Sequence, residues 1–318
     1  MRAVRFRTFG DPSVLHVEDV APPRAPTGDQ VLVRVDASSV NGTDLGLRRG
    51  DLKIATLGRM PFVPGFDVAG EVLRCGPAVT AFTPGDQVMA LLDHGGGGQA
   101  EQVLIRQHRA ALAPASSSAV EAAALPLAGL TALQALHGKA GLHARRGARV
   151  LVNGASGGIG SYGVQLAKLA GAHVTAVASA GRLAFAAELG ADALVDYREH
   201  EIADLGELWD IVFDAPGLLS FAAVRPVLDD GGVLVSTRPI ASDALRGLVP
   251  PPLRHDSRRF TAVMTRPRSQ DLAHLAALVD SGRLRVAVDR SFPLARASEA
   301  HRHAEGGVRG KVVIAVSG

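Results

Sequence analysis

The residues from 150 to 160 have the types and spacing that can hold a pyrophosphate. An apolar stretch, Val150–Val152, precedes the turn Asn153-Gly154-Ala155-Ser156-Gly157-Gly158-Ile159-Gly160, and a helix is expected to follow. Gly157 would let the backbone approach the phosphates, and Gly160 would let the helix pack closely on the strand. N–H groups at the helix start would then face the anion. A tight turn that serves packing alone is the alternative.

The flanking strand and helix favour a dinucleotide site over a turn with a packing role only. The cofactor-binding residues expected in this turn are Gly154, Ser156, Gly157, Gly158, Ile159 and Gly160.

The end of the next expected strand distinguishes NADP from NAD. NAD sites usually place Asp or Glu there to bind the ribose 2′-hydroxyl. Here the chain reads Ala178-Ser179-Ala180-Gly181-Arg182, and the first carboxylate is Glu188 inside the following helix. Ser179 can donate a hydrogen bond, and Arg182 either pairs with a 2′-phosphate or is a solvated residue of the first helical turn. The pattern favours NADPH as the cofactor.

The elements that must position this site change in character along the chain. Up to about residue 120, short alternating stretches broken by Gly and Pro indicate strands. Strands then alternate with helices, which predicts a doubly wound parallel sheet and an α/β fold. The six strands expected in this sheet are Arg149–Asn153, Val174–Ala178, Ala193–Val195, Ile211–Phe213, Val233–Val235 and Phe260–Met264.

Helices are expected at Ile159–Ala170, Leu183–Leu189 and Asp271–Val279, and later strands at Val286 and Lys311–Val316. The last fifty or so residues return to strands, so we expect them to rejoin the first domain. The expected domains are residues 1–122 with 266–318, and residues 123–265.

Composition excludes several classes of protein. The chain has 318 residues, which suggests about two domains, and its 47% hydrophobic and 20% charged content excludes global disorder. No apolar stretch is long enough to span a bilayer, and the first residues do not resemble a secretory signal. The one cysteine, Cys75, precludes an intrachain disulfide and a multi-cysteine zinc site. We therefore expect a cytoplasmic protein.

Nucleic-acid binding is disfavoured as a main function. The charge balance is 34 − 31 = +3, the arginines are scattered, and aromatic residues make up only 4% of the chain. Stacking platforms along a nucleic-acid groove need more aromatic side chains than this. An anionic small molecule remains compatible with the charge.

Several motifs, taken together, resemble one enzyme family from end to end. They are Ser39–Asp44, Pro64–Val72, Thr83–Val88, Ala123–Ala132, Asn153–Gly160, Glu188–Asp192 with Asp196-Tyr197, and Arg309–Val313. In this order and spacing the chain resembles zinc-independent members of the medium-chain dehydrogenase/reductase superfamily, and is most similar to the NADPH:quinone oxidoreductase branch.

The resemblance implies a GroES-like β-rich catalytic domain plus a Rossmann domain, with substrate and nicotinamide meeting in the cleft between them. It places Thr131 beside the nicotinamide and Tyr197 near the 2′-phosphate with Ser179. It also implies a homodimer paired through the last Rossmann strand, Phe260–Met264. Two further residues, Ala215 and Ser236, are expected to bind the cofactor.

The resemblance also implies that no metal is bound. Asn41 falls where zinc-dependent relatives have their first catalytic cysteine, and Phe66-Asp67 falls where they have a histidine ligand followed by a glutamate. Their four-cysteine structural lobe is missing. Without a Lewis acid, oxidation of an ordinary alcohol is disfavoured.

Hydride addition to a quinone or an α,β-unsaturated carbonyl needs less help, because the conjugated carbonyl delocalises the incoming charge. The protein must then place the nicotinamide near the acceptor and donate hydrogen bonds to the developing oxyanion. The candidate catalytic donors are Asn41 and Thr131, although Asn41 could instead stabilise the turn before Gly42.

The expected substrate pocket is assigned to Asp44, Phe62, His94 and Gln99. Asp44 is either a pocket residue or a helix cap, and His94 is either a pocket acid or a loop residue. Gln99 stands where family members often have a tyrosine, which puts a preference for aromatic quinones in doubt. Residues 237–259 form either a flap or a surface connection.

Three other functions share some of these motifs. The glycine turn resembles that of short-chain dehydrogenases, but neither tyrosine, Tyr162 or Tyr197, has the lysine that class requires four residues later. A non-catalytic NADPH-binding, redox-responsive protein would keep every cofactor motif. An enoyl-thioester reductase would keep the fold and change the substrate. The expected function is a metal-free NADPH-dependent reductase of a small electrophilic acceptor.

Overall fold

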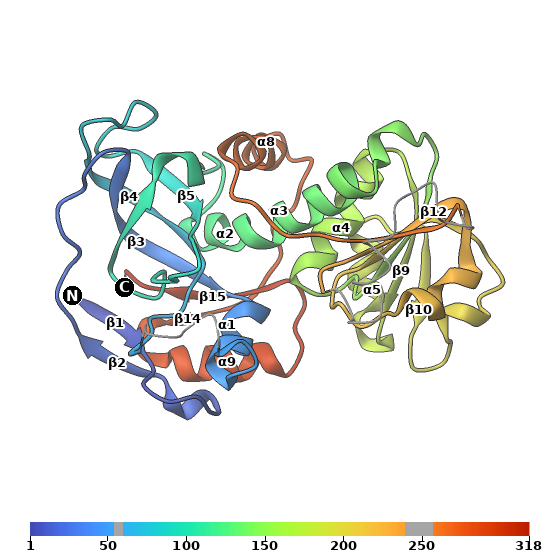
Figure 1. Ribbon diagram of the computed structural model, residues 1–318, viewed down its shortest axis with the longest axis horizontal. Helices are drawn as coiled ribbons and strands as arrows, with labels where there is room; N and C mark the ends of the chain where they lie inside the picture. The colour runs from blue at the N-terminus through green and yellow to red at the C-terminus, as the bar shows by residue number, and fades with distance from the viewer. Residues whose placement is uncertain (54–59, 239–256, 318) are drawn as a thin grey trace. The chain divides into compact units, whose positions relative to one another are not determined.

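The computed structural model describes residues 1–53, 60–238 and 257–317. The chain divides into two compact units (Figure 1). The first unit comprises Met1–Leu130 and Arg266–Gly318, so both ends of the chain contribute to it, and the second comprises Thr131–Thr265. The first boundary lies at Leu130 and not at residue 122, because the helix Pro126–Leu133 begins in the first unit and ends in the second. The proposed flap at 237–259 falls mostly outside the described residues.

The first unit is built on a seven-stranded sheet in the order β14-β15-β3-β4-β5-β7, with β6 pairing β3 off this path. A hairpin of β1 and β2 forms a separate two-stranded sheet. The bounds of these strands are β1 (Arg2–Arg5), β2 (His16–Asp19), β3 (Gln30–Val40), β4 (Asp67–Cys75), β5 (Gln87–Leu91), β6 (Gln102–Arg106), β7 (Ala110–Leu112), β14 (Val288–Pro293) and β15 (Lys311–Ala315).

Strand β3 is the centre of this sheet. It pairs antiparallel with β4, β6 and β15, and most of its residues are buried because neighbours cover both edges. Its register with β15 places Val40 opposite Val312. The residue after β3, Asn41, and the first residue of β15, Lys311, are therefore brought together although they are 270 positions apart.

The helices of the first unit begin and end at local signals. Helix α1 begins after the extended N-cap residue Asn41 and ends at Gly50, which adopts the left-handed conformation with φ of 94°. The bounds are α1 (Gly42–Arg49), α2 (Ala119–Ala124), α3 (Pro126–Leu133), α8 (Ser269–Asp280) and α9 (Ala297–Glu305). The apolar stretch at 119–136 is thus two short helices and a π-helical turn, not a membrane span.

The second unit contains a six-stranded parallel sheet in the order β10-β9-β8-β11-β12-β13. In chain order this is 3-2-1-4-5-6, which confirms the predicted doubly wound fold. The bounds are β8 (Arg149–Asn153), β9 (His173–Ala178), β10 (Ala193–Asp196), β11 (Trp209–Asp214), β12 (Leu228–Ser236) and β13 (Arg259–Ala262). All six predicted strands are present, although β13 ends at Ala262 and leaves Met264 78% exposed.

Helices α4 (Gly158–Leu169), α5 (Ala180–Glu188) and α6 (Phe221–Val224) connect these strands. Helix α5 begins three residues before the predicted start, so Arg182 lies in its first turn. Val150, Leu151 and Val152 of β8 are fully buried, as expected for a parallel strand covered on both faces. The strand order reverses between β8 and β11, which is where this type of sheet binds ligands.

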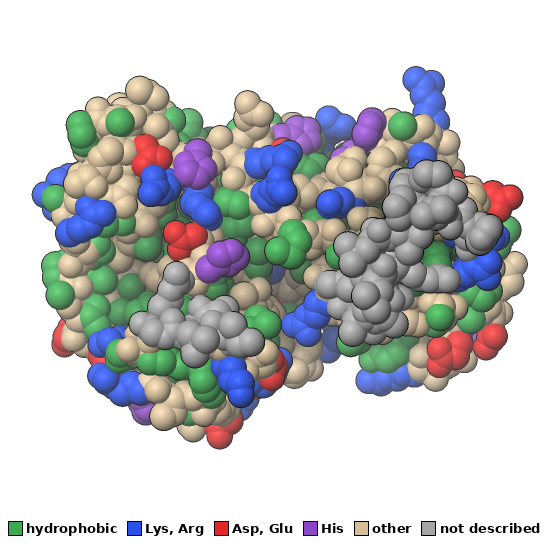
Figure 2. Space-filling model, in the orientation of Figure 1, with side chains coloured by type: hydrophobic (Ala, Val, Ile, Leu, Met, Phe, Trp, Pro, Cys, Tyr) green, Lys and Arg blue, Asp and Glu red, His purple; other side chains and the backbone are tan. Residues whose placement is uncertain are grey.

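The described surface shows no concentrated basic groove on the face seen in Figure 2, where Lys and Arg side chains are dispersed among residues of other types. No helix in the described part of the chain is both long and apolar enough to cross a bilayer.

Candidate active site

The glycine turn after β8 is shaped by close backbone packing at one end and left open at the other. A Cβ atom on Gly160 would lie 2.1 Å from the Gly154 carbonyl oxygen, so only glycine fits there. A Cβ on Gly157 would approach nothing closer than 3.4 Å. Gly157 is the N-cap of α4, and the first N–H groups of a helix have no partner inside it. The turn can therefore take an anion against Gly157.

The carboxyl ends of three strands are tied together by one carboxylate that sequence reasoning missed. Asp214 is fully buried, and its Oδ1 accepts from Asn153 Nδ2 at 3.0 Å and from Gly217 N at 3.2 Å. Its Oδ2 accepts from Leu219 N at 2.8 Å and from the Ser236 hydroxyl at 3.1 Å. Of the two predicted cofactor residues here, Ser236 is buried in this network, and Ala215 is 8% exposed.

The region after β9 and β10 gathers the residues expected near a 2′-phosphate. Ser179 is the N-cap of α5, and the N–H of Arg182 donates to its carbonyl at 2.8 Å. The N–H of Tyr197 donates to Ala178 O at 3.2 Å, which brings the two strand ends together. The guanidinium of Arg198, which was not predicted, lies 5.8 Å from the centre of the Tyr197 ring.

One carboxylate lies near this edge, but it is engaged by the backbone. Asp196 is 7% exposed, and its two oxygens accept from the N–H groups of Ala180 and Arg198, each at 2.9 Å. No carboxylate follows β9, where an NAD site usually has one. The ends of β9 and β10 thus present the hydroxyl of Ser179 and the ring of Tyr197. The guanidinium groups of Arg182 and Arg198 belong to the same region.

In the first unit, Asn41 belongs to a buried network of charged and polar side chains. The Lys311 ammonium donates to Asn41 Oδ1 and lies 3.6 Å from Asp67 Oδ2. Asn41 Nδ2 donates to Asp67 Oδ2 at 2.9 Å and to the Ser39 hydroxyl at 3.3 Å. Both ends of the Asn41 amide are therefore engaged inside the protein, and its predicted role as an oxyanion donor is not supported by this geometry.

The Asp67 carboxylate is fully buried and well partnered. Its Oδ2 also accepts from the Ser39 hydroxyl at 2.5 Å, while Oδ1 accepts from Leu127 N at 2.7 Å. Burial lowers the pKa of the Lys311 ammonium, and the carboxylates of Asp67 and Asp44 oppose that change.

Asp44 supports the start of α1 from inside. Its Oδ2 accepts from Asn41 N at 2.9 Å and its Oδ1 accepts from Gly65 N at 2.7 Å. The side chain is fully buried, so it stabilises the helix start and does not line the pocket. Burial raises the pKa of Asp44 to about 7, and the two backbone hydrogen bonds oppose this rise.

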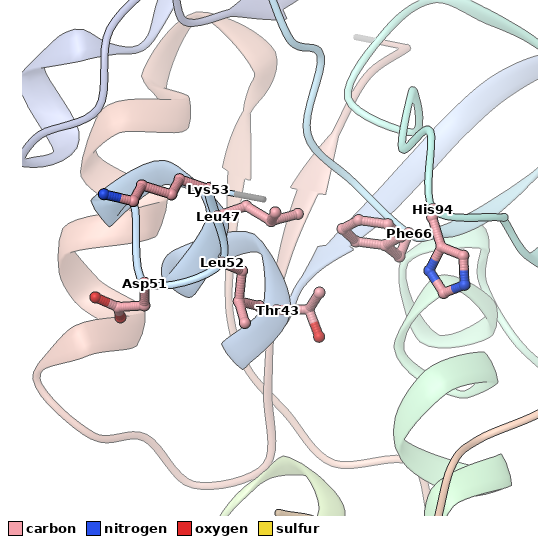
Figure 3. A pocket seen from close by; sticks show the side chains of 7 residues that line it. All are labelled: Thr43, Leu47, Asp51, Leu52, Lys53, Phe66 and His94. Carbon is pink, nitrogen blue, oxygen red and sulfur yellow. The ribbon is translucent and has the colours of Figure 1, made fainter. Parts of the chain in front are cut away.

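A pocket of about 460 Å³ lies beside this network in the first unit. Its lining residues are Thr43, Leu47, Asp51, Leu52, Lys53, Phe66 and His94. The rings of Phe66 and His94 lie side by side, while the side chains of Asp51 and Lys53 point away from them (Figure 3). Leu47, Leu52 and Phe66 give an apolar surface with Thr43 and His94 as polar neighbours, which suits a small, mostly apolar molecule.

Two residues expected in the substrate pocket are in the interior instead. Phe62 is 2% exposed, and its ring packs 5.6 Å from that of Phe6. Gln99 is fully buried, with its Nε2 lying 3.1 Å from His301 Nε2. Nothing in the sequence around Phe62 or Gln99 distinguishes an interior position from a pocket position, because the partners of both residues come from other parts of the chain.

The second predicted catalytic residue, Thr131, lies at the start of the second unit. Its hydroxyl is 2.6 Å from that of Thr265, and the residue is 3% exposed. Thr131 and Thr265 are the first and last residues of that unit.

The described residues around Asn41 and Asp67 do not fit a bound zinc ion. Among the described residues, no group of three or more His, Cys, Asp or Glu side chains is arranged to hold a metal. At Asn41 and Asp67 a cation would meet the buried Lys311 ammonium, which already neutralises the carboxylate. Cys75 is half-buried in β4, and its thiol donates to Phe82 O at 3.4 Å.

A doubly wound sheet with an open glycine turn, enclosed in sequence by a β-rich unit, defines the class of medium-chain dehydrogenases and reductases. Residues 27–116 match the family described as "Alcohol dehydrogenase GroES-like domain", and residues 189–314 match that described as "Zinc-binding dehydrogenase". The protein is therefore an oxidoreductase that uses a nicotinamide cofactor.

Relatives place the chain within this class. It is 34% identical over 325 residues to the chloroplast envelope quinone oxidoreductase homolog of Arabidopsis thaliana, covering 99% of this chain and 98% of the relative. It is 34% identical to the NADPH-dependent alkenal/one oxidoreductase of the same plant, covering 99% and 79%. The quinone oxidoreductase structure from Coxiella burnetii matches 100% of this chain and 99% of its own, with 31% identity and a TM-score of 0.90. The chain belongs to the quinone oxidoreductase branch of the superfamily.

Proposed function

We propose that the protein is an NADPH-dependent, metal-free reductase that transfers hydride to a quinone or an α,β-unsaturated carbonyl compound. The observation that carries the proposal is the buried Lys311–Asn41–Asp67 network beside an apolar pocket. An ammonium group held this way leaves no place for a Lewis-acid cation. The acceptor must therefore be electrophilic by itself, as a conjugated carbonyl is.

The preference for NADPH is supported by the edge formed after β9 and β10. Four residues with suitable side chains lie at these strand ends: Ser179, Arg182, Tyr197 and Arg198. The nearby Asp196 carboxylate is engaged by backbone N–H groups. The name of the alkenal/one oxidoreductase relative also specifies NADPH.

When bound, NADPH supplies a hydride from its nicotinamide ring. The chain's own residues bind and orient the reactants. Gly157 and the start of α4 would receive the pyrophosphate, and Arg182 with Arg198 would neutralise the 2′-phosphate. Leu47, Leu52 and Phe66 would exclude water around the acceptor, while Thr43 or His94 would donate a hydrogen bond to its carbonyl oxygen as charge develops there. A proton from solvent completes the reduction.

The test of the acceptor class compares conjugated acceptors with saturated carbonyl compounds. NADPH oxidation is measured with a naphthoquinone, an enal, an enone and an enoyl thioester, and with the matching saturated ketone and aldehyde. We expect turnover of the quinone, the enal or the enone and none of the saturated compounds. Turnover of the thioester alone would favour an enoyl-thioester reductase, and tight NADPH binding without any turnover would favour a non-catalytic binding protein.

The test of the cofactor compares three alanine variants. Arg182→Ala and Arg198→Ala should each raise the KM for NADPH about ten- to hundredfold, because a charge-assisted hydrogen bond contributes roughly 1.5–3 kcal/mol. The KM for NADH should not change. Arg24→Ala removes one exposed positive charge from the first unit and is the control. An unchanged ratio of NADPH to NADH efficiency in both variants would overturn the assignment.

The proposal includes two properties inferred from sequence and family resemblance. The first is a homodimer paired through β13, which has one neighbour, β12, in the described sheet and leaves its other edge open. The second is a cytoplasmic location. Light-scattering mass and cell fractionation would test them.

A further inference from the structure

Lys311 is a buried lysine whose position is set by sheet pairing. The antiparallel register of β15 with β3 places Val312 opposite Val40, so Lys311 lies beside Asn41. The residue is 3% exposed, and its ammonium contacts both Asn41 Oδ1 and Asp67 Oδ2. A buried charge of this kind is tolerated only when it is paired and hydrogen-bonded.

The contacts of Asn41 allow one orientation of its amide. The oxygen faces the Lys311 ammonium, and the nitrogen faces the Asp67 carboxylate at 2.9 Å. Turning the amide over would place its NH₂ group against the ammonium and its oxygen against the carboxylate. Lys311 and Asp67 therefore act on opposite ends of the same amide and exclude the reversed orientation.

This network borders two walls of the pocket. Asn41 is the N-cap of α1, and Thr43 and Leu47 of that helix line the pocket. Asp67 directly follows Phe66, whose ring forms the facing wall (Figure 3). A change in the position of Asn41 or Asp67 would be transmitted through one or two residues to the pocket surface.

We propose that Lys311 and Asp67 are positioning residues that fix the Asn41 amide and, through α1 and Phe66, the walls of the acceptor pocket. The effect on the acceptor rests on the proposed function of that pocket. The effect on the amide does not, and it can be measured without any reaction.

The variants separate charge balance from positioning. Lys311→Met removes the ammonium and leaves the Asp67 carboxylate buried beside no cation. Lys311→Met with Asp67→Asn removes both charges and allows either amide orientation at Asn41. The matched control is Lys168→Met, which breaks a half-exposed ion pair with Asp192 at 2.8 Å in the second unit.

Kinetics and thermal stability give the first readout. Lys311→Met should lower Tm and raise the acceptor KM about tenfold, with the Kd for NADPH within twofold of wild type. The double variant should recover only part of the Tm, because an amide at position 67 has one acceptor oxygen where the Asp67 carboxylate uses two. It should keep the raised acceptor KM, because no charge orients Asn41. An acceptor KM that recovers together with Tm would show a structural role alone and overturn the proposal, as would an unchanged KM in Lys311→Met.

Nuclear magnetic resonance gives a second readout that needs no activity. The chain has two asparagines, Asn41 and Asn153, so labelling asparagine with ¹⁵N yields two side-chain amide pairs. We expect sharp signals from both in the wild type and in Lys168→Met. In Lys311→Met the Asn41 pair should broaden or split, while the Asn153 pair stays sharp. The double variant carries a third asparagine at position 67, so its spectrum should contain a third pair, and the Asn41 pair should again broaden or split. An unperturbed Asn41 pair would refute the positioning role even if wild-type activity were found, whereas an inactive wild type with a perturbed pair would refute the proposed function alone.

Discussion

Replacing Gly157 with alanine should weaken NADPH binding without disrupting the turn. In the protein alone, the added Cβ would come no closer than 3.4 Å to any neighbour, and the backbone angles of this residue, −79° and 177°, are open to alanine. Alanine at an N-cap costs roughly 0.5–1 kcal/mol relative to glycine. A change of that size should lower Tm by no more than about 4 °C.

The cost to binding is larger because the methyl group would occupy the face expected to receive the pyrophosphate. Loss of one charge-assisted hydrogen bond to a phosphate corresponds to roughly 1.5–3 kcal/mol, or about a ten- to hundredfold rise in Kd. The assay is a titration of NADPH fluorescence, with Tm measured by calorimetry on the same sample. A wild-type Kd in Gly157→Ala would refute the placement of the pyrophosphate.

Two other glycines serve as comparisons for this prediction. Gly160→Ala would put its Cβ 2.1 Å from the Gly154 carbonyl oxygen, so backbone atoms must shift by more than an ångström. Overpacking of this kind costs about 1–3 kcal/mol or more, and Tm should fall together with NADPH affinity. Gly138→Ala meets nothing within 4 Å and should leave both quantities unchanged. If Gly160→Ala were as stable as wild type, the account of the turn's packing would be wrong.

Three further outcomes are expected. Burial lowers the pKa of His301 to about 3, so the unfolded state binds more protons and stability is lost as pH falls below about 6.5. Between pH 6.5 and 5 the wild type should lose roughly 1–2 kcal/mol relative to His301→Gln, measured by urea unfolding, and parallel curves would contradict this. Asp44→Asn leaves one of two buried backbone N–H groups without an acceptor and should cost about 1–3 kcal/mol, a prediction refuted by unchanged stability. Treatment with a chelator should leave the rate of NADPH oxidation within about twofold of the untreated rate, and activity restored by added zinc would contradict the metal-free mechanism.

The second unit was the more predictable part of the fold because its signals are local. Each strand is a short apolar stretch, and glycine marks the ends of helices such as the one before Gly171. The glycine turn and the first turn of α5 could be placed from neighbouring residues alone. Strand β14 begins at Val288, two residues after the position expected, which reflects the weak definition of strand ends in sequence.

The first unit was harder to predict because its candidate site is assembled by long-range pairing. Lys311 belongs to a motif that was recognised, yet its contact with Asn41 follows from the register of β15 on β3. For the same reason Gln99 was assigned to the pocket, whereas its buried contact with His301 spans 202 positions. Local residue types do not reveal which distant strand or helix a polar side chain will face.

The most direct test of the proposed reaction follows a deuterium label from the cofactor to the product. NADPH carrying deuterium at both hydrogen positions of nicotinamide C4 is oxidised with an enone that the enzyme reduces, and the product is analysed by mass spectrometry. Direct hydride transfer predicts one deuterium on the carbon β to the carbonyl and a proton from solvent on the α-carbon. Product without deuterium, or oxidation of NADPH that leaves the enone unchanged, would contradict the account.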